Sequence, residues 1–402
     1  MSHHPRVAFF TDSYHETNGV AHTSRHLEAF AKREHIPFLC VRAGKESEKF
    51  QDESITAVEF KRSSIGFGLE RDMRFDFLMW RNLKNALQAA RDFRADLVHI
   101  TGPSDIGQIG ARIAFLLKVP LVISWHTNLH DYAGKRLEKL LAFLPETQCK
   151  TIAGWGERNA LKATLRFYKL GRQLFAPNEE LVDLLKHGTE KPTSLMQRGV
   201  DTEIFSPLKR DSEDNIFRLG FVGRLSPEKN VRFLAEIEKS LLDAGKSNFR
   251  FLLVGDGSER SWLENHLRHA TFTGILKGEA LSKAYANMDA FLFPSQTDAF
   301  GNVILEAMAS GVPCIVTDQG GPKFLVQHKV NGLIARNERE FVTAVIDMMS
   351  QSQNHEHMRL AARQAACGAS WDRVFEKVYE DYRVCLHSQN LIETRNQFAA
   401  AR

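Results

Sequence analysis

The chain has 402 residues, of which 43% are hydrophobic and 25% are charged, and its formal net charge at pH 7 is +4. This composition is ordinary for a soluble globular chain of about two to three domains that can bury full cores. The longest apolar stretch, Ile113 to Ser124, contains Lys118 and Pro120 and is shorter than the roughly 20 residues of a bilayer span, which excludes a membrane-spanning helix.

Cysteine usage and the N-terminus indicate a cellular compartment. The cysteines show neither a C-x-x-C pair nor metal-finger spacing, and they are Cys40, Cys149, Cys314, Cys367 and Cys385. A reducing cytoplasm is the simplest setting for such a chain. The chain continues from Arg6 directly into an apolar run, so we expect no signal peptide and a cytoplasmic protein.

The first half of the chain alternates short apolar runs with amphipathic segments. Strands are expected near Val7 to Thr11, Phe38 to Arg42, Leu97 to Thr101, Leu121 to Trp125 and Gln173 to Ala176, with Ser194 to Gln197 as a further candidate. This alternation is typical of a parallel sheet with helices on both faces. Ligands bind such sheets at the carboxyl ends of the strands, so the loops after these strands hold the candidate site residues.

The loop after the first strand contains Asp12 and Gly19, and a helix is expected from about Thr23. A glycine at this place allows backbone N–H groups to approach a phosphate without a side chain in the way. A lone glycine in a loop is more often only a turn. Both interpretations stay open on these residues alone, and Asp12 is a weaker candidate.

His126 follows the strand Leu121 to Trp125 in the segment S-W-H-T-N. A histidine at the end of a strand is an acid, a base or a hydrogen-bond partner that titrates near neutral pH, although an isolated histidine is more often structural. His130, four residues later, and Arg198, in the segment Q-R-G-V-D, are weaker candidates at the same edge.

A basic segment extends from Tyr132 to Arg172, with nine basic and three acidic residues. Within it, one face of an expected helix from Glu157 to Leu170 carries four cations, namely Arg158, Lys162, Arg166 and Lys169. Such a face binds either an anionic lipid surface or an acidic acceptor, or it is only a solvated helix face, and both interpretations stay open. No basic stripe is interleaved with aromatic residues, so we do not expect a nucleic-acid partner.

The polar stretch Pro207 to Asn215 lacks apolar periodicity and is interpreted as a linker between a first domain, residues 1–207, and a second domain, residues 208–371. The second domain begins with the strand Phe217 to Val222, followed by Gly223 and a helix from Val231 to Leu242.

Two cations, Arg224 and Lys229, flank the turn between this strand and this helix. A guanidinium fork and a compact ammonium group five residues apart are suited to the oxygens of a diphosphate. A solvated turn with a surface pair between Glu228 and Lys229 is the alternative.

Two carboxylates, Asp298 and Glu306, bracket a small-residue loop after the strand Ala290 to Phe293. A helix is expected from about Asn302 to Ser310, which places Glu306 roughly 6 Å along its axis. The free amides at its start, from Phe300, Gly301 and Asn302, favour negative charge, and carboxylates accept hydroxyl protons. For an isolated pair of carboxylates, a cap and a solvated helix residue are the more frequent explanation.

Three motifs occur together in a recognisable order in the second half. They are the G-R-L-x-x-E-K-N turn at Gly223 to Asn230, the V-G-D-G turn that contains Gly255 and Gly257, and the segment from Asp298 to Glu306, an E-x7-E segment with aspartate first. Over most of its length the chain resembles the retaining glycosyltransferases of family 4. The resemblance implies an α/β GT-B fold: two doubly wound Rossmann-like domains face each other across a cleft, and a C-terminal helix, about 372–402, crosses back to the first domain.

The resemblance also implies an activity, namely transfer of a hexosyl group with retention from a UDP- or GDP-hexose to a hydroxyl acceptor. No D-x-D motif occurs, so we expect neither a cofactor nor a metal; Arg224, Lys229 and the helix start after Phe300 would stabilise the leaving diphosphate. A nucleotide-sugar epimerase of related fold and a non-catalytic sugar-nucleotide binding protein remain as alternatives.

Roles for single residues follow from the same resemblance. His126 and Asp298 contact and orient the donor sugar, Glu306 accepts the ribose hydroxyls, and Gly19 and Gly223 lie against the donor phosphates. Gly255 and Gly257 leave room for the nucleotide, and the backbone near Ile275 meets the base. The family has glutamate where this chain has Asp298, which leaves the identity of the sugar open.

The turn Gly320-Gly321-Pro322 and the T-D-x-F-G-N segment are similar to those of a bacterial branch of the family. That branch includes sulfolipid synthase-like and GDP-mannose-dependent α-mannosyltransferase-like enzymes. It implies a role in glycolipid or polysaccharide biosynthesis and an acceptor that is a lipid-linked sugar or a small polyol. Peripheral association with the inner face of the membrane stays open.

Overall fold

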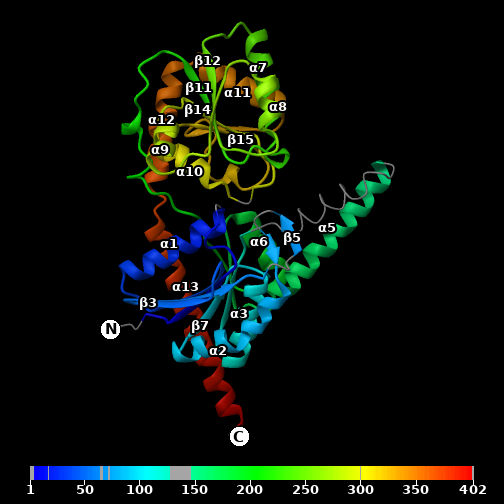
Figure 1. Ribbon diagram of the computed structural model, residues 1–402, viewed down its shortest axis with the longest axis vertical. Coiled ribbons are helices and arrows are strands. Elements are labelled where there is room, and N and C mark those ends of the chain that lie inside the picture. The colour runs from blue at the N-terminus through cyan, green and yellow to red at the C-terminus, as the bar shows by residue number, and fades with distance from the viewer. Residues whose placement is uncertain are drawn as a thin grey trace. The chain divides into compact units, whose positions relative to one another are not determined.

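The computed structural model describes residues 4–16, 18–63, 67–70, 73–126, 146–298 and 300–400. The chain forms two compact units (Figure 1). The first unit contains Met1–Gln197 together with Asp372–Arg402, and the second unit contains Arg198–Trp371. Both are α/β units built on a mainly parallel sheet, as the alternation of strands and helices predicts.

The first unit has an eight-stranded sheet in the order β10-β9-β8-β7-β1-β2-β4-β3. Its strands are β1 (Val7–Thr11), β2 (Phe38–Gly44), β3 (Glu48–Asp52), β4 (Ile55–Lys61), β7 (Leu97–Ile100), β8 (Leu121–Ser124), β9 (Gln173–Ala176) and β10 (Thr193–Leu195). A separate hairpin pairs β5 (Phe67–Glu70) with β6 (Met73–Phe75). The edge strand β3 is antiparallel to β4 and wholly exposed, so it has no apolar alternation that would have predicted it.

The helices of the first unit follow its strands in the usual alternation. They are α1 (Gly19–Arg33), α2 (Leu83–Asp92), α3 (Asp105–Leu117), α5 (Glu146–Tyr168), α6 (Glu179–Thr189) and α13 (Trp371–Ala400), with a 3-10 turn, η1 (Phe77–Asn82), before α2. The last helix packs on α1, because the rings of Phe375 and Tyr379 lie 5.7 and 5.9 Å from that of Phe30. The expectation that this helix returns to the first domain is confirmed.

The second unit has a six-stranded parallel sheet in the order β13-β12-β11-β14-β15-β16. Its strands are β11 (Phe217–Val222), β12 (Phe249–Val254), β13 (Ala270–Gly274), β14 (Ala290–Phe293), β15 (Cys314–Thr317) and β16 (Gly332–Ala335). The chain builds outward from β11 in one direction and from β14 in the other, so the strand order reverses between these two neighbours. Ligands of doubly wound sheets bind at such a reversal.

The sheet of the second unit is covered on both faces. Its helices are α7 (Phe233–Asp243), α8 (Arg260–His266), α9 (Gly278–Ala286), α10 (Asn302–Ala309), α11 (Glu338–Ser350) and α12 (Ser352–Cys367), with 3-10 turns η2 (Pro207–Lys209), η3 (Pro227–Lys229) and η4 (Pro322–Phe324). One core cluster joins Phe251 to α7 and α11, and the other joins Val254 to α9, α10 and α12. Side chains that alternate along the strands therefore fill two separate layers.

The boundary between the units differs from the expected one at residues 207 and 208. The second unit begins at Arg198, because Val200 belongs to its core and the Val200 amide donates to the carbonyl of Ala369 at 3.0 Å. Gly199 lies so close to Trp371 that an added Cβ would be 2.4 Å from the Trp371 nitrogen. The two points at which the chain crosses between units therefore lie side by side.

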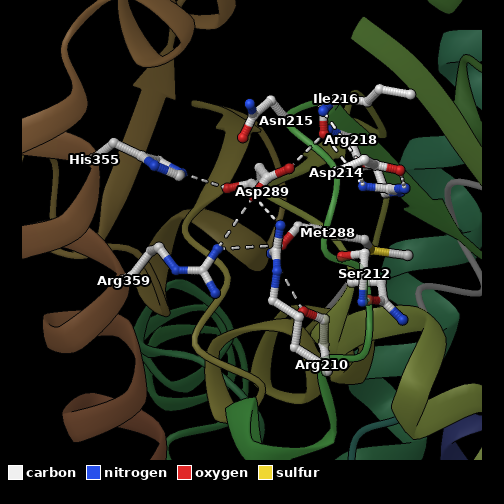
Figure 2. Close-up of polar contacts among 12 residues, drawn as sticks. Arg210, Ser212, Asp214, Asn215, Ile216, Arg218, Met288, Asp289, His355 and Arg359 are labelled. Atoms are coloured by element: carbon white, nitrogen blue, oxygen red, sulfur yellow. Dashed lines mark hydrogen bonds and ion pairs between the residues drawn. The ribbon is translucent and has the colours of Figure 1, made fainter.

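The stretch interpreted as a linker is part of the second unit. Figure 2 shows Arg210 and Arg359 directed at Asp289, with nitrogen to Oδ1 distances of 2.9 and 3.5 Å. The same carboxylate accepts from the Arg218 amide at 2.8 Å, and the Asp289 carbonyl lies 2.7 Å from His355 Nε2. The high charge that suggested a linker serves instead to bind this stretch to the unit.

Within the part of the chain that the structure describes, none of the helices combines the length and apolarity needed to cross a membrane. This agrees with the interruption of the apolar stretch Ile113 to Ser124, which divides between α3 and β8.

Candidate active site

Two expected site residues meet where the strand order of the second unit reverses. Lys229 lies at the end of η3, in the turn after β11, and Asp298 lies in the loop after β14. Lys229 Nζ donates to Asp298 Oδ1 at 2.6 Å, and the two side chains are 22% and 21% exposed. The ammonium group is thus paired with a carboxylate, and both side chains remain partly exposed.

Two buried oxygen atoms near this loop, Asp298 Oδ2 and Asn302 Oδ1, have no hydrogen-bond partner among the residues that the structure describes. Buried polar atoms are paired in the great majority of cases, so an unpaired acceptor needs an explanation. Both atoms are acceptors, and hydroxyl groups are the donors that would satisfy them. The loop therefore offers two acceptor positions to a polyhydroxylated ligand.

The turn from Gly320 to Pro322 packs against the loop that contains Asp298. The Gly321 amide donates to the carbonyl of Asp298 at 2.7 Å, and an added Cβ at Gly320 would be 2.8 Å from the same oxygen. Gly320 has a φ of +72°, which favours glycine. From the sequence this turn indicated only a branch of the family, and its contact with the candidate site was missed.

The start of α10 follows Asp298 as expected. Gly301 caps the helix with a φ of +89°, and the helix begins at Asn302, the predicted residue. Phe300 is buried, and the Arg198 guanidinium lies over its ring at 5.9 Å. Burial lowers the pKa of Arg198 to about 10, whereas the nearby Asp298 charge raises it. Arg198, a weaker candidate expected at the same edge as His126, belongs instead to the second unit, near Asp298.

Glu306 occupies the second turn of α10. Tyr285, a fully buried residue of α9, donates its hydroxyl to Glu306 Oε2 at 2.7 Å. Burial raises the pKa of Glu306, and the bond from Tyr285 lowers it. The sequence did not point to Tyr285, because its position in the amphipathic helix α9 looks like that of an ordinary core residue. A hydroxyl at a core-facing position needs a partner, and that need was the available signal.

Arg224 lies on the exposed side of its turn. Its guanidinium is 3.9 Å from the carboxylate of Glu228, its side chain is 42% exposed, and Glu228 accepts from the Ser226 hydroxyl. An exposed pair of this kind is weak, so it does not hold Arg224 away from an anionic ligand. Gly223, directly before it, has a φ of +152°, which the turn out of β11 requires.

The glycines of the V-G-D-G turn allow a close backbone contact within the second unit. A Cβ at Gly255 would lie 1.9 Å from the carbonyl oxygen of Gly223, and one at Gly257 would lie 2.2 Å from that of Leu225. The two turns after β11 and β12 therefore pack backbone against backbone. This packing is one reason for glycine at both positions, and their expected role toward a nucleotide stays a prediction. Ile275, after β13, is 67% exposed, and its expected position near the base also stays a prediction.

In the first unit, α1 begins at Gly19 rather than near Thr23. Asn18 caps it by accepting from the Ala21 amide at 2.9 Å, so the free amides of this helix start in the loop after β1. Asp12 lies in the same loop, where its carbonyl accepts from Arg62 and burial raises the pKa of its carboxyl group.

His126 comes two residues after β8, and its Nε2 lies 2.7 Å from the hydroxyl oxygen of Ser124. The unit boundaries place His126 and Asp12 in the first unit and the lysine–aspartate pair in the second. His130 lies outside the described residues.

The basic face on α5 is exposed. The side chains of Arg158, Lys162, Arg166 and Lys169 are all exposed, and two apolar residues of the same helix, Ile152 and Trp155, are 39% and 64% exposed. Among the residues that the structure describes, no three His, Cys, Asp or Glu side chains gather as metal ligands would.

Comparison with known proteins decides the family. Residues 18–204 match the family described as "Glycosyltransferase Family 4", and residues 216–351 match "Glycosyl transferases group 1". A GDP-mannose-dependent alpha-mannosyltransferase of Mycobacterium tuberculosis is 31% identical over 307 residues, which cover 74% of this chain and 75% of that protein.

The chain belongs to glycosyltransferase family 4. It is an enzyme that transfers a glycosyl group, and the expected family, fold and enzyme class are confirmed.

Other members of glycosyltransferase family 4 are similar over shorter or longer stretches. Sulfoquinovosyl transferase SQD2 of Arabidopsis thaliana is 27% identical, with coverage of 71% of this chain and 56% of that protein. Alpha-monoglucosyldiacylglycerol synthase of Streptococcus pneumoniae is 22% identical, with coverage of 96% and 87%. The structure of Anabaena HepE in complex with UDP and glucose aligns with a TM-score of 0.66 at 18% identity, over 94% of this chain and 100% of that one, which shows the shared GT-B fold.

Proposed function

We propose that this chain moves a hexosyl group from a UDP- or GDP-hexose to a hydroxyl group of a membrane lipid or glycolipid, with retention of anomeric configuration and without a divalent cation. The observation that carries the proposal is the pair Lys229–Asp298 beside two unpartnered acceptors, Asp298 Oδ2 and Asn302 Oδ1. A cation next to sugar-accepting oxygens is the arrangement that a nucleoside diphosphate sugar needs at its scissile bond.

Charge development explains the cations. When the bond between the anomeric carbon and the diphosphate oxygen breaks, the nucleoside diphosphate leaves with the electron pair. Lys229 stabilises that charge, and Arg224 adds a guanidinium fork for the phosphate oxygens. The acceptor oxygen forms its bond on the face that the diphosphate leaves, and its proton passes to a departing phosphate oxygen, so that configuration is retained.

Donor and acceptor classes draw support from the relatives. The mycobacterial relative is named for GDP-mannose, HepE was solved with UDP and glucose, and the pneumococcal relative is named for a glucosyldiacylglycerol product. We expect Glu306 to accept the ribose hydroxyls and Asp298, which stands where the family is expected to have a longer glutamate, to contact the sugar.

The test is a thermal-shift screen of UDP-, GDP- and ADP-hexoses followed by transfer assays with diacylglycerol and glycolipid acceptors. A donor that binds only the folded chain raises its melting temperature, by linkage. We expect one UDP- or GDP-hexose to do so and to give an α-linked product at the same rate with and without EDTA. Donor turnover without any acceptor, as an epimerase would show, or binding without turnover would contradict the proposal, as would a metal requirement.

We also propose that α5 attaches the enzyme to anionic membranes, in support of a lipid acceptor. Its exposed cations stand beside exposed Ile152 and Trp155, which provides charge and apolar area on one helix. Each Lys or Arg near an anionic surface contributes about 1 kcal/mol.

Co-sedimentation with phosphatidylglycerol vesicles tests this attachment. The double variant Lys162→Ser/Arg166→Ser should lose roughly 30-fold in partition, or about 2 kcal/mol. The matched control is Lys84→Ser/Arg91→Ser on α2, which also removes one exposed lysine and one exposed arginine from the first unit. It should bind the vesicles as the wild type does. Equal losses in the two variants would show net charge alone to be responsible.

A further inference from the structure

One oxygen of the Glu306 carboxylate is held by a buried tyrosine. Tyr285 on α9 is 0% exposed, and its hydroxyl oxygen lies 2.7 Å from Glu306 Oε2 on α10. The other carboxylate oxygen, Oε1, forms no hydrogen bond with the residues that the structure describes, and Glu306 is half-buried. One oxygen is therefore bound by the protein, and the other is left for a ligand.

Packing fixes the direction of the Tyr285 side chain. Its ring lies against those of Phe205 and Phe291, with ring centres 5.6 and 5.8 Å away. Tyr285 and Phe291 belong to the same core cluster as the buried face of α10. Because protein interiors are close-packed and core side chains occupy defined rotamers, the Tyr285 hydroxyl stays directed at Glu306.

The ionisation of the two groups gives the direction of this hydrogen bond. Burial raises the pKa of Tyr285 well above its ordinary value, so the phenol keeps its proton and donates it to the ionised carboxylate. Burial raises the pKa of Glu306, and the bond from Tyr285 lowers it, so the tyrosine favours the ionised form. The other titratable group beside Tyr285 is the thiol of Cys314, whose pKa is also raised by burial.

We propose that Tyr285 is a positioning residue, which binds Oε2 and so keeps the Glu306 carboxylate turned with Oε1 toward the ribose hydroxyls of the nucleotide donor. The ribose end of this statement rests on the proposed function. Without the phenol, Oε2 is a buried acceptor that lacks its donor, which is costly, and the carboxylate can rotate or take up a proton. Tyr285 therefore affects recognition of the ribose and not of the base or the diphosphate.

The first test compares nucleotides with and without ribose hydroxyls. Isothermal titration calorimetry on the full chain gives the dissociation constants of UDP and GDP and of their 2′,3′-dideoxy counterparts. The wild type should prefer the ribonucleotide that it binds by roughly 10-fold to 100-fold, the effect of hydrogen bonds to a charged group. In Tyr285→Phe we expect this preference to fall by roughly tenfold, with little change for the dideoxy nucleotide.

The ratio of the two dissociation constants excludes a merely structural effect, because a loss of folded protein weakens the apparent binding of both nucleotides equally. Phe205→Leu is the matched control. Phe205 packs edge-on against the Tyr285 ring and carries no polar group, so this variant disturbs the packing and keeps the hydroxyl. It should retain the preference for ribose. An unchanged ratio in Tyr285→Phe, or an equal fall in both variants, would overturn the proposal.

The second test needs no ligand. A ¹³C NMR titration of the full chain, labelled at the glutamate carboxyl carbons, follows the ionisation of Glu306, and the variant Glu306→Gln identifies its signal by the loss. The midpoint should be higher in Tyr285→Phe than in the wild type, because the phenol stabilises the ionised carboxylate. Phe205→Leu should titrate as the wild type does. A midpoint that does not rise in Tyr285→Phe would refute the action of Tyr285 on Glu306.

The outcomes separate this inference from the proposed function. If the wild type transfers a hexose but binds a nucleotide and its dideoxy counterpart equally well, the ribose role of Glu306 is wrong and the inference fails, while the proposed transfer stands. If no UDP or GDP compound binds, the proposed function fails, and the ligand side of the inference fails with it, whatever the carboxyl titration shows.

Discussion

The two polar regions of this molecule differ in how completely their groups are paired. At the carboxyl edge of the second sheet, Lys229 and Asp298 are charged and partly exposed, and two acceptor atoms there have no partner within the described part of the chain. In the first unit, Tyr382, His99 and Ser124 are neutral, buried and joined into one path. The incomplete set is where a ligand would supply the missing donors, whereas the complete set joins the last helix to two strands of the first sheet.

The largest effect on activity is expected from a substitution of Lys229. This substitution tests whether the partly exposed polar region serves the reaction. In the proposed mechanism Lys229 stabilises the leaving diphosphate, so Lys229→Ala should lower kcat roughly 10²-fold to 10³-fold, as the loss of one preorganised charge or donor does. Steady-state transfer assays measure it, with Lys239→Ala on α7, an exposed lysine, as the control. A loss below tenfold would mean that the paired lysine serves the fold and not the reaction.

The second effect concerns the backbone contact between the turns after β11 and β12. Gly255→Ala should destabilise the second unit by roughly 2 to 5 kcal/mol, because the new Cβ meets the Gly223 carbonyl and the φ is +139°. Gly245→Ala is the control: its φ is +73°, nothing lies within 4 Å, and strain alone costs about 1 kcal/mol. Urea unfolding of the full chain compares them, and equal losses would disprove the packing explanation.

The smallest effect concerns Glu306 and the pH dependence of the melting temperature. Its folded-state pKa is raised, so the carboxyl group binds its proton more tightly when folded, and the resulting stabilisation at low pH is lost as pH rises through the folded pKa. The Glu306→Gln variant has no carboxyl group to ionise at this position, so it does not lose stability in this way as the pH rises. We expect its melting temperature to exceed that of the wild type at pH 7 to 8 and the difference to shrink toward pH 4, while nucleotide affinity falls. A constant difference across pH would contradict the linkage.

Much of the fold follows from the sequence, and so do the individual candidate residues of the second unit. Apolar runs such as those at Val7 and Phe217 mark buried parallel strands, and Asn302 opens its helix where the spacing predicts. The turn motifs also give Lys229 and Asp298 as candidates. Their pairing is a different matter, because it depends on two strands being neighbours, β11 and β14, that are far apart in the chain.

The sequence was least informative where buried polar groups look like core. His99 stands in an apolar strand, and its partner Tyr382 is 283 residues away on a helix that shows only helical periodicity. Charge also misled: the ionic residues between Pro207 and Asn215 indicated a solvated linker, yet Arg210 binds Asp289 inside the second unit. Both the His99–Tyr382 contact and the Arg210–Asp289 pair join residues that are far apart in the sequence. Composition and local spacing do not predict such contacts.

The return of α13 has a consequence for the order in which the enzyme is made. During synthesis, residues 198–371 emerge in full before Tyr382 does, so the second unit can fold while the sheet of the first unit still lacks its last helix. The contact of Tyr382 with His99 forms only when that helix docks. A nascent or prematurely ended chain would therefore complete the second unit first and this buried hydrogen-bonded path last.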